Sequence, residues 1–370
     1  MRLSVVTPSY NQGRFIRATI DSVLSQGIED LEYWVIDGGS TDGTVDILRS
    51  YGDRIRWVSE RDRGQSDAIN KGLRRSGGEV VCWLNSDDVF LPGCLRAVQE
   101  AFAADPRLDL AYGDGLLIDE AGAGLGRFPA TEDFDLWRLV NVWDYILQPS
   151  AFFRRSALER VGYLDEGLHY TLDWDLWIKL ALSGSVRRLP GDLACSREYG
   201  STKTASGGWR RFREIVRLMR RHGAPWNAPG ILLYGSDTLR KNWAGTRLFG
   251  DLANRFANRC AARAHRAIRS RYADGWAGPR CELWIPCAGG RGAALAITVH
   301  DWFPYLDLHI RRQDGSSRRR LAPGTHRIDL DAPAGGGPLR LRLETDRYLI
   351  PASRGESTDQ RMLSYQISIA

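Results

Sequence analysis

Short apolar runs alternate with helical patterns over the first 90 residues, and this alternation constrains the fold more than any other feature of the sequence. The apolar runs are rich in β-branched and aromatic residues and cover residues 3–7, 33–36, 55–58 and 80–84. Between them, apolar residues such as Ile16, Ile20 and Val23 recur at helical spacing. Near-continuous apolar runs are typical of strands covered on both faces, and strand–helix–strand repetition gives a parallel, doubly wound sheet. The sequence therefore predicts an α/β, Rossmann-like fold for this region.

The chain changes character twice after this region. Arginine-rich helical patterns cover residues 209–222 and 247–273, with a connector containing Pro and Gly between them. From Trp276 onward, short alternating strands separated by Gly, Pro and Asp turns replace the helical period, which is typical of a β-sandwich. We therefore expect an α/β domain at 1–205, a basic helical linker at 206–275 and a small all-β sandwich at 276–370.

Composition limits the class of protein. Of the 370 residues, 43% are hydrophobic and 26% are charged, as in an ordinary soluble globular protein. The formal net charge of +6 comes from an excess of arginine, most of it after residue 186. A basic excess suits nucleic acid, an anionic membrane surface or a phosphorylated substrate. Because the sequence has no recognisable nucleic-acid-binding module and no aromatic residues interleaved with the arginines, we expect no nucleic-acid partner.

The sequence predicts neither secretion nor a membrane span. It has no run of about 18 apolar residues, no apolar signal segment at its start and no close cysteine spacing, so we expect a cytoplasmic protein. The pattern at 252–272 places Arg255, Arg259 and Arg263 on one stripe of a basic amphipathic helix. Such a helix either lies on the inner face of the membrane, as a peripheral contact, or packs its apolar side on the α/β domain. The oligomeric state is left open.

Polar residues follow all four predicted strands. The segments are 7–11 (TPSYN), 37–43 (DGGSTDG), 59–64 (SERDRG) and 85–88 (NSDD). In a doubly wound sheet, ligands bind beyond the carboxyl ends of the strands. Any one segment alone suits a turn or a helix cap. Four together predict a binding site at this edge of the sheet.

These segments resemble family 2 glycosyltransferases, which are inverting enzymes with the GT-A fold. The motifs TPSYNQGRFI, VIDGGSTDGT, DRGQSDAINKGL and LNSDD occur in the family's order, and the resemblance covers about residues 1–205. It implies a nucleotide-sugar donor and a nucleotide pocket in which Pro8 and Tyr10 line the base and Asp37 hydrogen-bonds the base or ribose. The full set of residues expected to bind the nucleotide is Pro8, Tyr10, Asn11, Asp37, Asp62, Gly64, Asn85 and Ser86.

The resemblance also implies a metal site at Asn85-Ser86-Asp87, where the family carries its DXD motif. A departing nucleoside diphosphate carries charge that a divalent cation neutralises, and oxygen ligands suit Mn²⁺ or Mg²⁺. Asp87 is the expected metal ligand. Asn85 departs from the motif because an amide adds no charge, and Asp88 is the neighbouring acid able to compensate.

An inverting transfer needs a base that takes the proton from the attacking hydroxyl. By resemblance this base is Asp173, at the start of a predicted helix, although Leu172 replaces the acid that usually precedes it. Asp175 points away from Asp173 on a helix and is expected to be the more structural partner. The helix dipole alone also favours an acid at either position.

Two further segments complete the expected site. Gln148 lies in a segment that resembles one bordering the acceptor pocket of related enzymes. Arg197 and Lys203 lie where relatives have a loop over the diphosphate, and there they would clamp phosphate oxygens.

The sequence thus predicts a metal-dependent, inverting glycosyltransferase with a UDP-sugar as the default donor. The expected acceptor is a hydroxyl of a glycan or lipid-linked glycan in bacterial surface polysaccharide synthesis. The alternative is a catalytically impaired glycan-binding or scaffolding protein, which the missing acids at Asn85 and Leu172 favour. In the predicted β-sandwich, the aromatic residues at 284, 302, 303 and 305 either stack on sugar or form the core.

Overall fold

The computed structural model describes residues 1–200, 207–243, 254–260, 264, 276–287, 290–348 and 363–369. The chain divides into two compact units, the first made of residues 1–132 and 144–221 and the second of residues 133–143 and 222–370. It therefore enters the second unit briefly at 133–143 and then returns to the first. The boundaries expected near 205 and 275 stay predictions.

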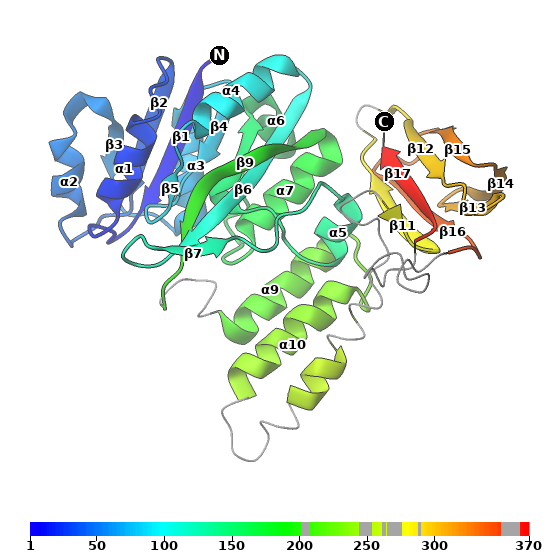
Figure 1. Cartoon of the computed structure of the whole chain (residues 1–370). Coiled ribbons are helices and arrows are strands. Elements are labelled where there is room, and N and C mark those ends of the chain that lie inside the picture. Colours follow the sequence, from blue (N-terminus) through cyan, green and yellow to red (C-terminus); the bar gives the residue numbers. More distant parts are fainter. Residues whose placement is uncertain are drawn as a thin grey trace. The chain divides into compact units, whose positions relative to one another are not determined.

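The first unit is built on one sheet with the strand order β3-β2-β1-β4-β8-β6-β9-β5, in which β7 pairs with β6 (Figure 1). Its strands are β1 (Leu3–Ser9), β2 (Leu31–Asp37), β3 (Arg56–Ser59), β4 (Val80–Trp83), β5 (Val89–Phe90), β6 (Leu108–Ile118), β7 (Gly124–Arg127), β8 (Ala151–Arg154) and β9 (Ser185–Arg197). Strands β1 to β4 are parallel, and the predicted α/β class is confirmed.

The sheet as a whole is mixed rather than parallel. Strand β8 runs antiparallel to β4 and β6, and β5 runs antiparallel to β9. The chain re-enters the sheet next to the end of β4, where Gln148 Nε2 donates to the carbonyl of Trp83 at 2.9 Å. Because β8 starts at that edge, it must run in the opposite direction to β4.

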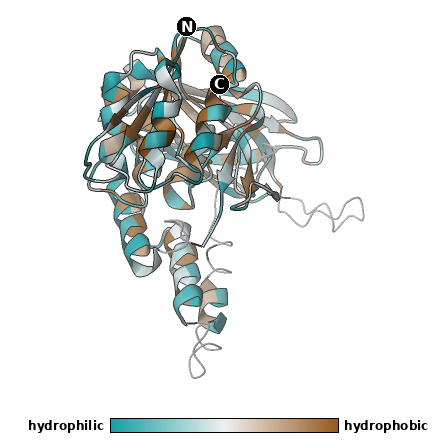
Figure 2. Ribbon diagram, turned by 90° about the vertical axis from the view of Figure 1, so that its left-hand side faces the viewer, coloured by the Kyte–Doolittle hydropathy of each residue, from teal (hydrophilic) through white to brown (hydrophobic). Residues whose placement is uncertain are grey.

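Helices cover both faces of this sheet. They are α1 (Ile16–Leu24), α2 (Thr44–Ser50), α3 (Gln65–Arg75), α4 (Cys94–Ala104), α6 (Arg155–Val161), α7 (Leu172–Ser183) and α9 (Gly208–Arg221), with short 3₁₀ turns at η1 (Gly52–Arg54) and η2 (Gln148–Ser150). On one face, α1, α2 and α4 share a core with the side chains of Val5, Tyr33 and Cys82. In Figure 2 the strands of the sheet are largely brown, as expected for strands covered on both sides.

The opposite face is covered by α3, α6 and α7. Helix α3 approaches so closely that a Cβ on Gly72 would lie 2.3 Å from Cγ1 of Val6, so glycine is required there. The Trp177 ring of α7 stacks on Trp83 of β4 with centroids 5.3 Å apart. The two helices thus pack directly on β1 and β4.

The second unit contains α5 (Leu136–Asn141), α10 (Pro229–Trp243) and two antiparallel sheets with the orders β10-β17-β12-β15 and β11-β16-β13-β14. The strands are β10 (Trp276–Ala277), β11 (Arg280–Ile285), β12 (Ala293–Val299), β13 (Leu306–Arg312), β14 (Gly315–Leu321), β15 (Gly324–Leu330), β16 (Leu339–Glu344) and β17 (Tyr365–Ile369). Alternate residues of both sheets, such as Leu295 and Leu341, share one buried core. The predicted all-β sandwich is confirmed.

Of the predicted helix at 252–272, residues 254–260 are helical and most of the rest, Arg263 included, lies outside the described residues. In the part of the chain that the structure describes, no helix is both long enough and apolar enough to cross a membrane.

Candidate active site

The carboxyl ends of the first four strands meet at one edge of the sheet. Ser9 at the end of β1 pairs with Asp37 at the end of β2, and Asp37 pairs with Ser59 at the end of β3. The N–H of Leu84, just after β4, donates to the carbonyl of Val6 at 2.9 Å. The four polar segments singled out in the sequence therefore lie side by side.

Hydrogen bonds join the loops that follow β1 and β2. The N–H of Asn11 donates to Ser40 Oγ at 2.7 Å, and the N–H of Thr41 donates to Asn11 Oδ1 at 2.9 Å. Asn11 adopts a φ of 51°, in the left-handed region that asparagine tolerates better than most residues. The N–H of Gly13 donates to Asp42 Oδ2 at 2.9 Å. The two loops thus form one hydrogen-bonded wall of the site.

Asp37 holds the loop that follows β2 in shape through hydrogen bonds to its side chain. Its side chain is buried, and its Oδ2 accepts hydrogen bonds from the N–H groups of Gly39 (3.1 Å) and Ser40 (2.9 Å) and from Ser59 Oγ (2.6 Å). Its Oδ1 accepts from Ser40 Oγ at 2.5 Å. Both carboxylate oxygens therefore hold the loop in shape.

Tyr10 is the aromatic side chain that this wall presents to solvent, with 61% of its surface exposed. Its ring and the carboxylate of Asp62 flank Gly38, where an added Cβ would lie 2.5 Å from Asp62 Oδ2 and 3.3 Å from Tyr10 Cδ2. The N–H of Gly64 donates to Asp62 Oδ1 at 2.9 Å and fixes that carboxylate. Pro8 lies buried within β1. An exposed ring beside an anchored acid is a suitable surface for a nucleobase and its ribose.

Asn85 lies at the centre of a polar network. Its Oδ1 accepts from Gln65 Nε2 at 2.8 Å, while its Nδ2 donates to Asp88 Oδ2 at 3.0 Å and to Gln148 Oε1 at 2.8 Å. Gln148 in turn donates to the carbonyl of Trp83. An amide satisfies this position because it both donates and accepts, whereas a carboxylate only accepts.

Asp87 and Asp88 have different environments. Asp87 is half-buried, and the Tyr199 hydroxyl donates to its Oδ2 at 2.7 Å. Asp88 is buried, as is Ser86. Burial, and next the charge of Asp87, raise the pKa of Asp88 to about 8, although hydrogen bonds from the Arg197 N–H and the Asn85 amide lower it. Of the two acids, Asp87 is therefore the one that a ligand can reach.

Arg197 is buried and braces the acidic loop. Its Nε donates to the backbone carbonyl of Asp87 at 2.9 Å, and its Nη1 donates to the carbonyls of Asp119 (2.8 Å) and Glu120 (3.1 Å). The guanidinium thus contacts backbone oxygens close to Asp87. Lys203 lies outside the described residues.

Arg14 and Tyr199 join the site, although neither was among the predicted site residues. The Arg14 guanidinium lies 4.3 Å from the ring centroid of Phe15 and 5.0 Å from that of Tyr199. It also pairs with the Glu120 carboxylate. Arg14 belongs to the first motif, but only the fold shows that this cation lies over the Tyr199 ring and that the Tyr199 hydroxyl contacts Asp87.

Asp173 lies in the first turn of α7 and is half-buried, and its Oδ1 accepts from the N–H of Trp174 at 2.8 Å. Asp175 is buried and pairs with Lys179 at 3.2 Å and with Arg221 at 3.6 Å. Of these two acids, Asp173 is the one partly open to solvent, and Asp175 is held in ion pairs.

Asp144 is a further acid that sequence reasoning missed. It is half-buried, and its Oδ1 accepts from the N–H of Ile146 at 3.0 Å. Burial, and next the charge of Asp173, raise the pKa of Asp144 well above its usual value, while Arg211 lowers it. Asp144 follows the excursion at 133–143, so no local sequence pattern connects it with Asp173.

The donor set suits a hard divalent cation only if most ligands come from outside the protein. Within the described residues, no group of three His, Cys, Asp or Glu side chains could hold a metal ion. Asp87 offers one carboxylate, whereas Asn85 and Asp88 are engaged with each other. Mg²⁺ and Mn²⁺ commonly bind one or two carboxylates and take other oxygens from water and phosphate. The residues present fit such a cation together with a diphosphate.

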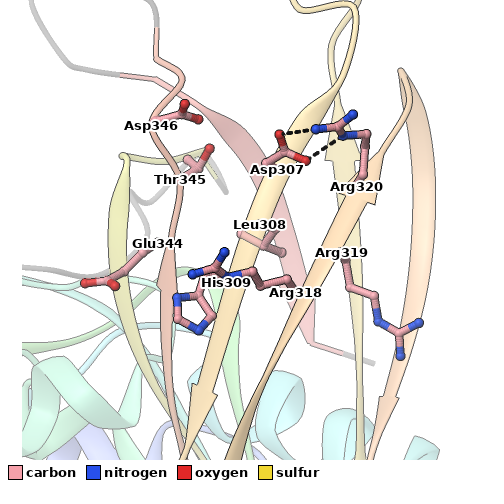
Figure 3. A pocket seen from close by; sticks show the side chains of 9 residues that line it. All are labelled: Asp307, Leu308, His309, Arg318, Arg319, Arg320, Glu344, Thr345 and Asp346. Carbon is pink, nitrogen blue, oxygen red and sulfur yellow. Dashed lines mark hydrogen bonds and ion pairs between the residues drawn. The ribbon is translucent and has the colours of Figure 1, made fainter.

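The second unit carries a hollow of about 600 Å³ on the sheet containing β13, β14 and β16 (Figure 3). Its charged lining residues are Asp307, Arg318, Arg319, Arg320, Glu344 and Asp346. Asp307 binds Arg320 through both carboxylate oxygens, at 2.7 and 2.9 Å. The lining mixes charges of both signs.

The aromatic residues considered in the sandwich differ in burial. Trp284 and Phe303 are buried. The guanidinium groups of Arg320 and Arg347 lie 4.3 and 4.1 Å from the ring centroid of Tyr305. Trp302 is half-buried and stacks on Trp276. The four residues at 284, 302, 303 and 305 do not form one sugar-binding surface.

A family model and two relatives with similar sequences are all described as glycosyltransferases. The model of the family described as "Glycosyl transferase family 2" matches residues 4–162. An uncharacterized glycosyltransferase of Nostoc sp. is 28% identical over 222 residues, covering 56% of this chain and 67% of the relative. An uncharacterized glycosyltransferase of Rickettsia felis is 30% identical over 282 residues, covering 69% of this chain and 45% of the relative. The chain thus spans about half to two thirds of these relatives.

Among solved structures, S. aureus TarS 1-349 in complex with UDP-GlcNAc has a similar fold. The TM-score is 0.51 at 18% sequence identity, with 71% of this chain and 79% of the other covered. This likeness, together with the mixed sheet of the first unit, identifies the fold as GT-A.

Proposed function

Since residues 4–162 of the chain belong to glycosyl transferase family 2, we propose that the protein is an inverting glycosyltransferase that transfers a sugar from a nucleoside-diphosphate sugar to a hydroxyl group. The observation that carries the proposal is the meeting of Tyr10, Asp62 and Asp87 at the carboxyl edge of β1 to β4. That arrangement offers a ring for a base, an acid for a ribose and an acid beside a diphosphate.

In this mechanism the donor is held by the strand ends. The exposed ring of Tyr10 stacks on the base, and Asp62 accepts hydrogen bonds from the ribose hydroxyls. Asp37 acts indirectly, because both of its oxygens shape the loop that carries Gly38 and Ser40. Asn11 contributes in the same indirect way.

Asp87 would hold the divalent cation, with Tyr199 donating to the same carboxylate. Mn²⁺ or Mg²⁺ bound there supplies positive charge to the leaving diphosphate. Arg14 lies over the Tyr199 ring and is paired with Glu120, so it would reach the diphosphate only by leaving that ion pair. Asn85 and Asp88 support the same loop through the hydrogen bond between their side chains.

Asp173 is the proposed base. It takes the proton from the acceptor hydroxyl while that oxygen attacks the anomeric carbon from the side opposite the leaving group, which inverts the configuration. Its partial exposure in the first turn of α7 supports this role. Holding the two substrates in line supplies much of the remaining rate.

We also propose a class of donor and a class of acceptor. We take a UDP-sugar as the first donor to test, since the staphylococcal protein of the same fold was solved with UDP-GlcNAc. We propose a glycan or lipid-linked glycan of a bacterial surface polysaccharide as the acceptor.

The test is thermal unfolding with UDP, dTDP, GDP and CDP, each with and without Mn²⁺. A ligand at one hundred times its Kd adds about 2.7 kcal/mol to the free energy of unfolding, a Tm shift of roughly 5–10 °C for a unit of this size. We expect one nucleotide to give this shift only with metal, and Asp87→Ala to abolish it. The control is Asp53→Ala, which removes an exposed acid on η1. If no nucleotide shifts the Tm of the wild-type protein, the proposed function is wrong.

A further inference from the structure

Helix α9 carries a single acid, Glu214, and this acid contacts the segment that leads into α7. Its Oε1 accepts hydrogen bonds from the N–H groups of His169 (3.0 Å), Tyr170 (2.6 Å) and Thr171 (2.9 Å), and from Thr171 Oγ1 (3.0 Å). Its Oε2 accepts from the N–H of His169 at 3.1 Å. One carboxylate therefore holds three successive backbone N–H groups.

Three successive N–H groups that converge on one point form a concavity suited to an anion. They also lie just before a helix, where the dipole favours negative charge. Thr171 is the N-cap of α7, and its own side chain makes no capping hydrogen bond. Glu214 thus accepts from the N-cap N–H of Thr171, as the glutamate of a capping box does, but from a helix distant in the sequence.

A second contact ties α9 to the same region. Arg221 Nη1 donates to Asp165 Oδ2 at 2.7 Å and lies 3.6 Å from Asp175 Oδ1. The first turn of α7 is therefore held by Glu214 before Asp173 and by Arg221 after it.

We propose that Glu214 is a positioning residue for the glycosyl transfer: by fixing residues 169–171 it sets the location of the Asp173 carboxylate relative to the acceptor. The proposal rests on the proposed role of Asp173 as the base. A displacement of about 1 Å at a reacting group costs about 100-fold in rate. Donor binding uses the ends of β1 to β4, which Glu214 does not touch.

The test compares Glu214→Ala and Glu214→Gln in the full chain with Glu32→Ala as the matched control. Glu32 is also a multiply bonded carboxylate of the first unit, but it lies at the start of β2, at the opposite edge of the sheet. We expect Glu214→Ala to lower kcat about 100-fold with the donor KM unchanged within twofold. Glu214→Gln retains an acceptor oxygen and should recover part of kcat. Glu32→Ala should lower Tm but keep kcat.

Amide hydrogen exchange gives a readout that does not depend on activity. Faster exchange at 169–171 in Glu214→Ala, with the rest of the sheet unchanged, is expected. Unchanged exchange, or accelerated exchange with full kcat, overturns the proposal. The wild-type protein could lack transfer activity while Glu214→Ala still accelerates exchange at 169–171. In that case the proposed function is wrong, and only the contact between Glu214 and residues 169–171 is supported.

The outer face of α9 carries a second, independent feature. Arg210, Arg213 and Arg217 are exposed along one stripe, and in the region that the structure describes none of the three forms an ion pair. The exposed Trp209 lies beside them. The helix's only acid, Glu214, is engaged in the α7 contact, so nothing on α9 offsets these charges.

We infer that this arginine stripe docks on an anionic bilayer surface. A basic helix face with an adjacent tryptophan suits the headgroup region, where arginines meet lipid phosphates and the indole lies at the interface. The charge complementarity is between guanidinium groups and anionic lipid.

The test is co-sedimentation with vesicles of phosphatidylcholine alone or with about 30% phosphatidylglycerol, at low and high salt. Because each arginine near the surface contributes about 1 kcal/mol, R213Q/R217Q should weaken binding to the anionic vesicles about 30-fold. The control R318Q/R319Q removes two exposed arginines of β14 and should change binding less than threefold. Equal losses in both variants, no binding to anionic vesicles, or α9-dependent binding to duplex DNA instead of vesicles would each overturn the inference.

Discussion

Replacing Asn85 by aspartate gives the acidic loop the charge that the DXD motif normally carries, and the structure predicts that this change is harmful. Asn85 Nδ2 lies 3.0 Å from Asp88 Oδ2 and 2.8 Å from Gln148 Oε1. Asn85→Asp removes both donated hydrogen bonds and places a second carboxylate against the buried Asp88. The amide at this position is therefore required by its neighbour.

The magnitude follows from the geometry. Two unit charges 3.0 Å apart repel by about 5 kcal/mol at an effective dielectric constant of about 20. Each lost hydrogen bond adds about 1 kcal/mol, and uptake of a proton by the pair relieves part of the repulsion. Because burial raises the pKa of Asp88 to about 8, this acid takes up a proton at pH 8 at a cost below about 1 kcal/mol, and the lost hydrogen bonds dominate. We expect the free energy of unfolding to fall by about 2–3 kcal/mol at pH 8 without metal.

The assay is urea unfolding of the wild type, Asn85→Asp, Asp88→Asn and the double variant. The double variant exchanges the amide and the acid, so the amide now at position 88 can donate to the carboxylate now at position 85. This contact should recover most of the loss, with a coupling energy of about 2–3 kcal/mol. A single Asn85→Asp variant within about 0.5 kcal/mol of the wild type would refute the reasoning, and so would a double variant no more stable than that single one.

Three further predictions concern separate parts of the first unit. Asp173→Asn should lower kcat about 100- to 10,000-fold while nucleotide-induced shifts in Tm persist, because the base does not contact the donor; retained turnover would remove Asp173 from its role. Tyr10→Ala should raise the nucleotide Kd about tenfold, measured by calorimetry, and Tyr10→Phe should not, because stacking needs only the ring. In Glu32, burial raises the pKa but hydrogen bonds from Gly77 and Ser4 outweigh it, so the folded-state pKa lies below the usual value. Its stabilisation is present at neutral pH and is lost as pH falls through the lowered pKa, so Glu32→Ala should cost about 3 kcal/mol at pH 7 and progressively less below about pH 4.5 in urea unfolding. A cost independent of pH would contradict this.

The strand half of the site could be predicted from the sequence because its signals are local. Each polar segment directly follows an apolar run, and parallel strands must end at the same edge. That rule brings Tyr10, Asp37, Asp62 and Asp87 together without any knowledge of long-range contacts. It does not show that Asp37 turns both oxygens into its own loop, because a side-chain direction within a turn depends on hydrogen bonds that the pattern does not encode.

In the helical half, the resemblance gave Asp173 and Asp175, but the contacts of these acids could not be predicted because they join segments distant in the chain. Asp144 and Asp173 are far apart in the sequence, and Glu214 reaches residues 169–171 from a helix that the sequence assigned to a basic linker. Because α9 is rich in arginine, the sequence pattern gave no sign that its single acid, Glu214, makes a specific contact. The structure places α9 within the first unit, where one of its faces is occupied by Glu214 and Arg221.

The departure at Asn85 and the unexpected role of Glu214 have the same physical origin. Carboxylates gathered at one edge of a sheet repel one another, so each must be matched by a donor or a cation, or lose its charge. Asp88 is matched by the Asn85 amide, Asp175 by Lys179 and Arg221, and Glu214 by three backbone N–H groups. Unlike the buried Asp88 and Asp175, Asp87 and Asp173 stay partly open to solvent. Only an acid that a ligand can reach is able to hold a cation or take a proton from a substrate, and this is why we place the chemistry on these two.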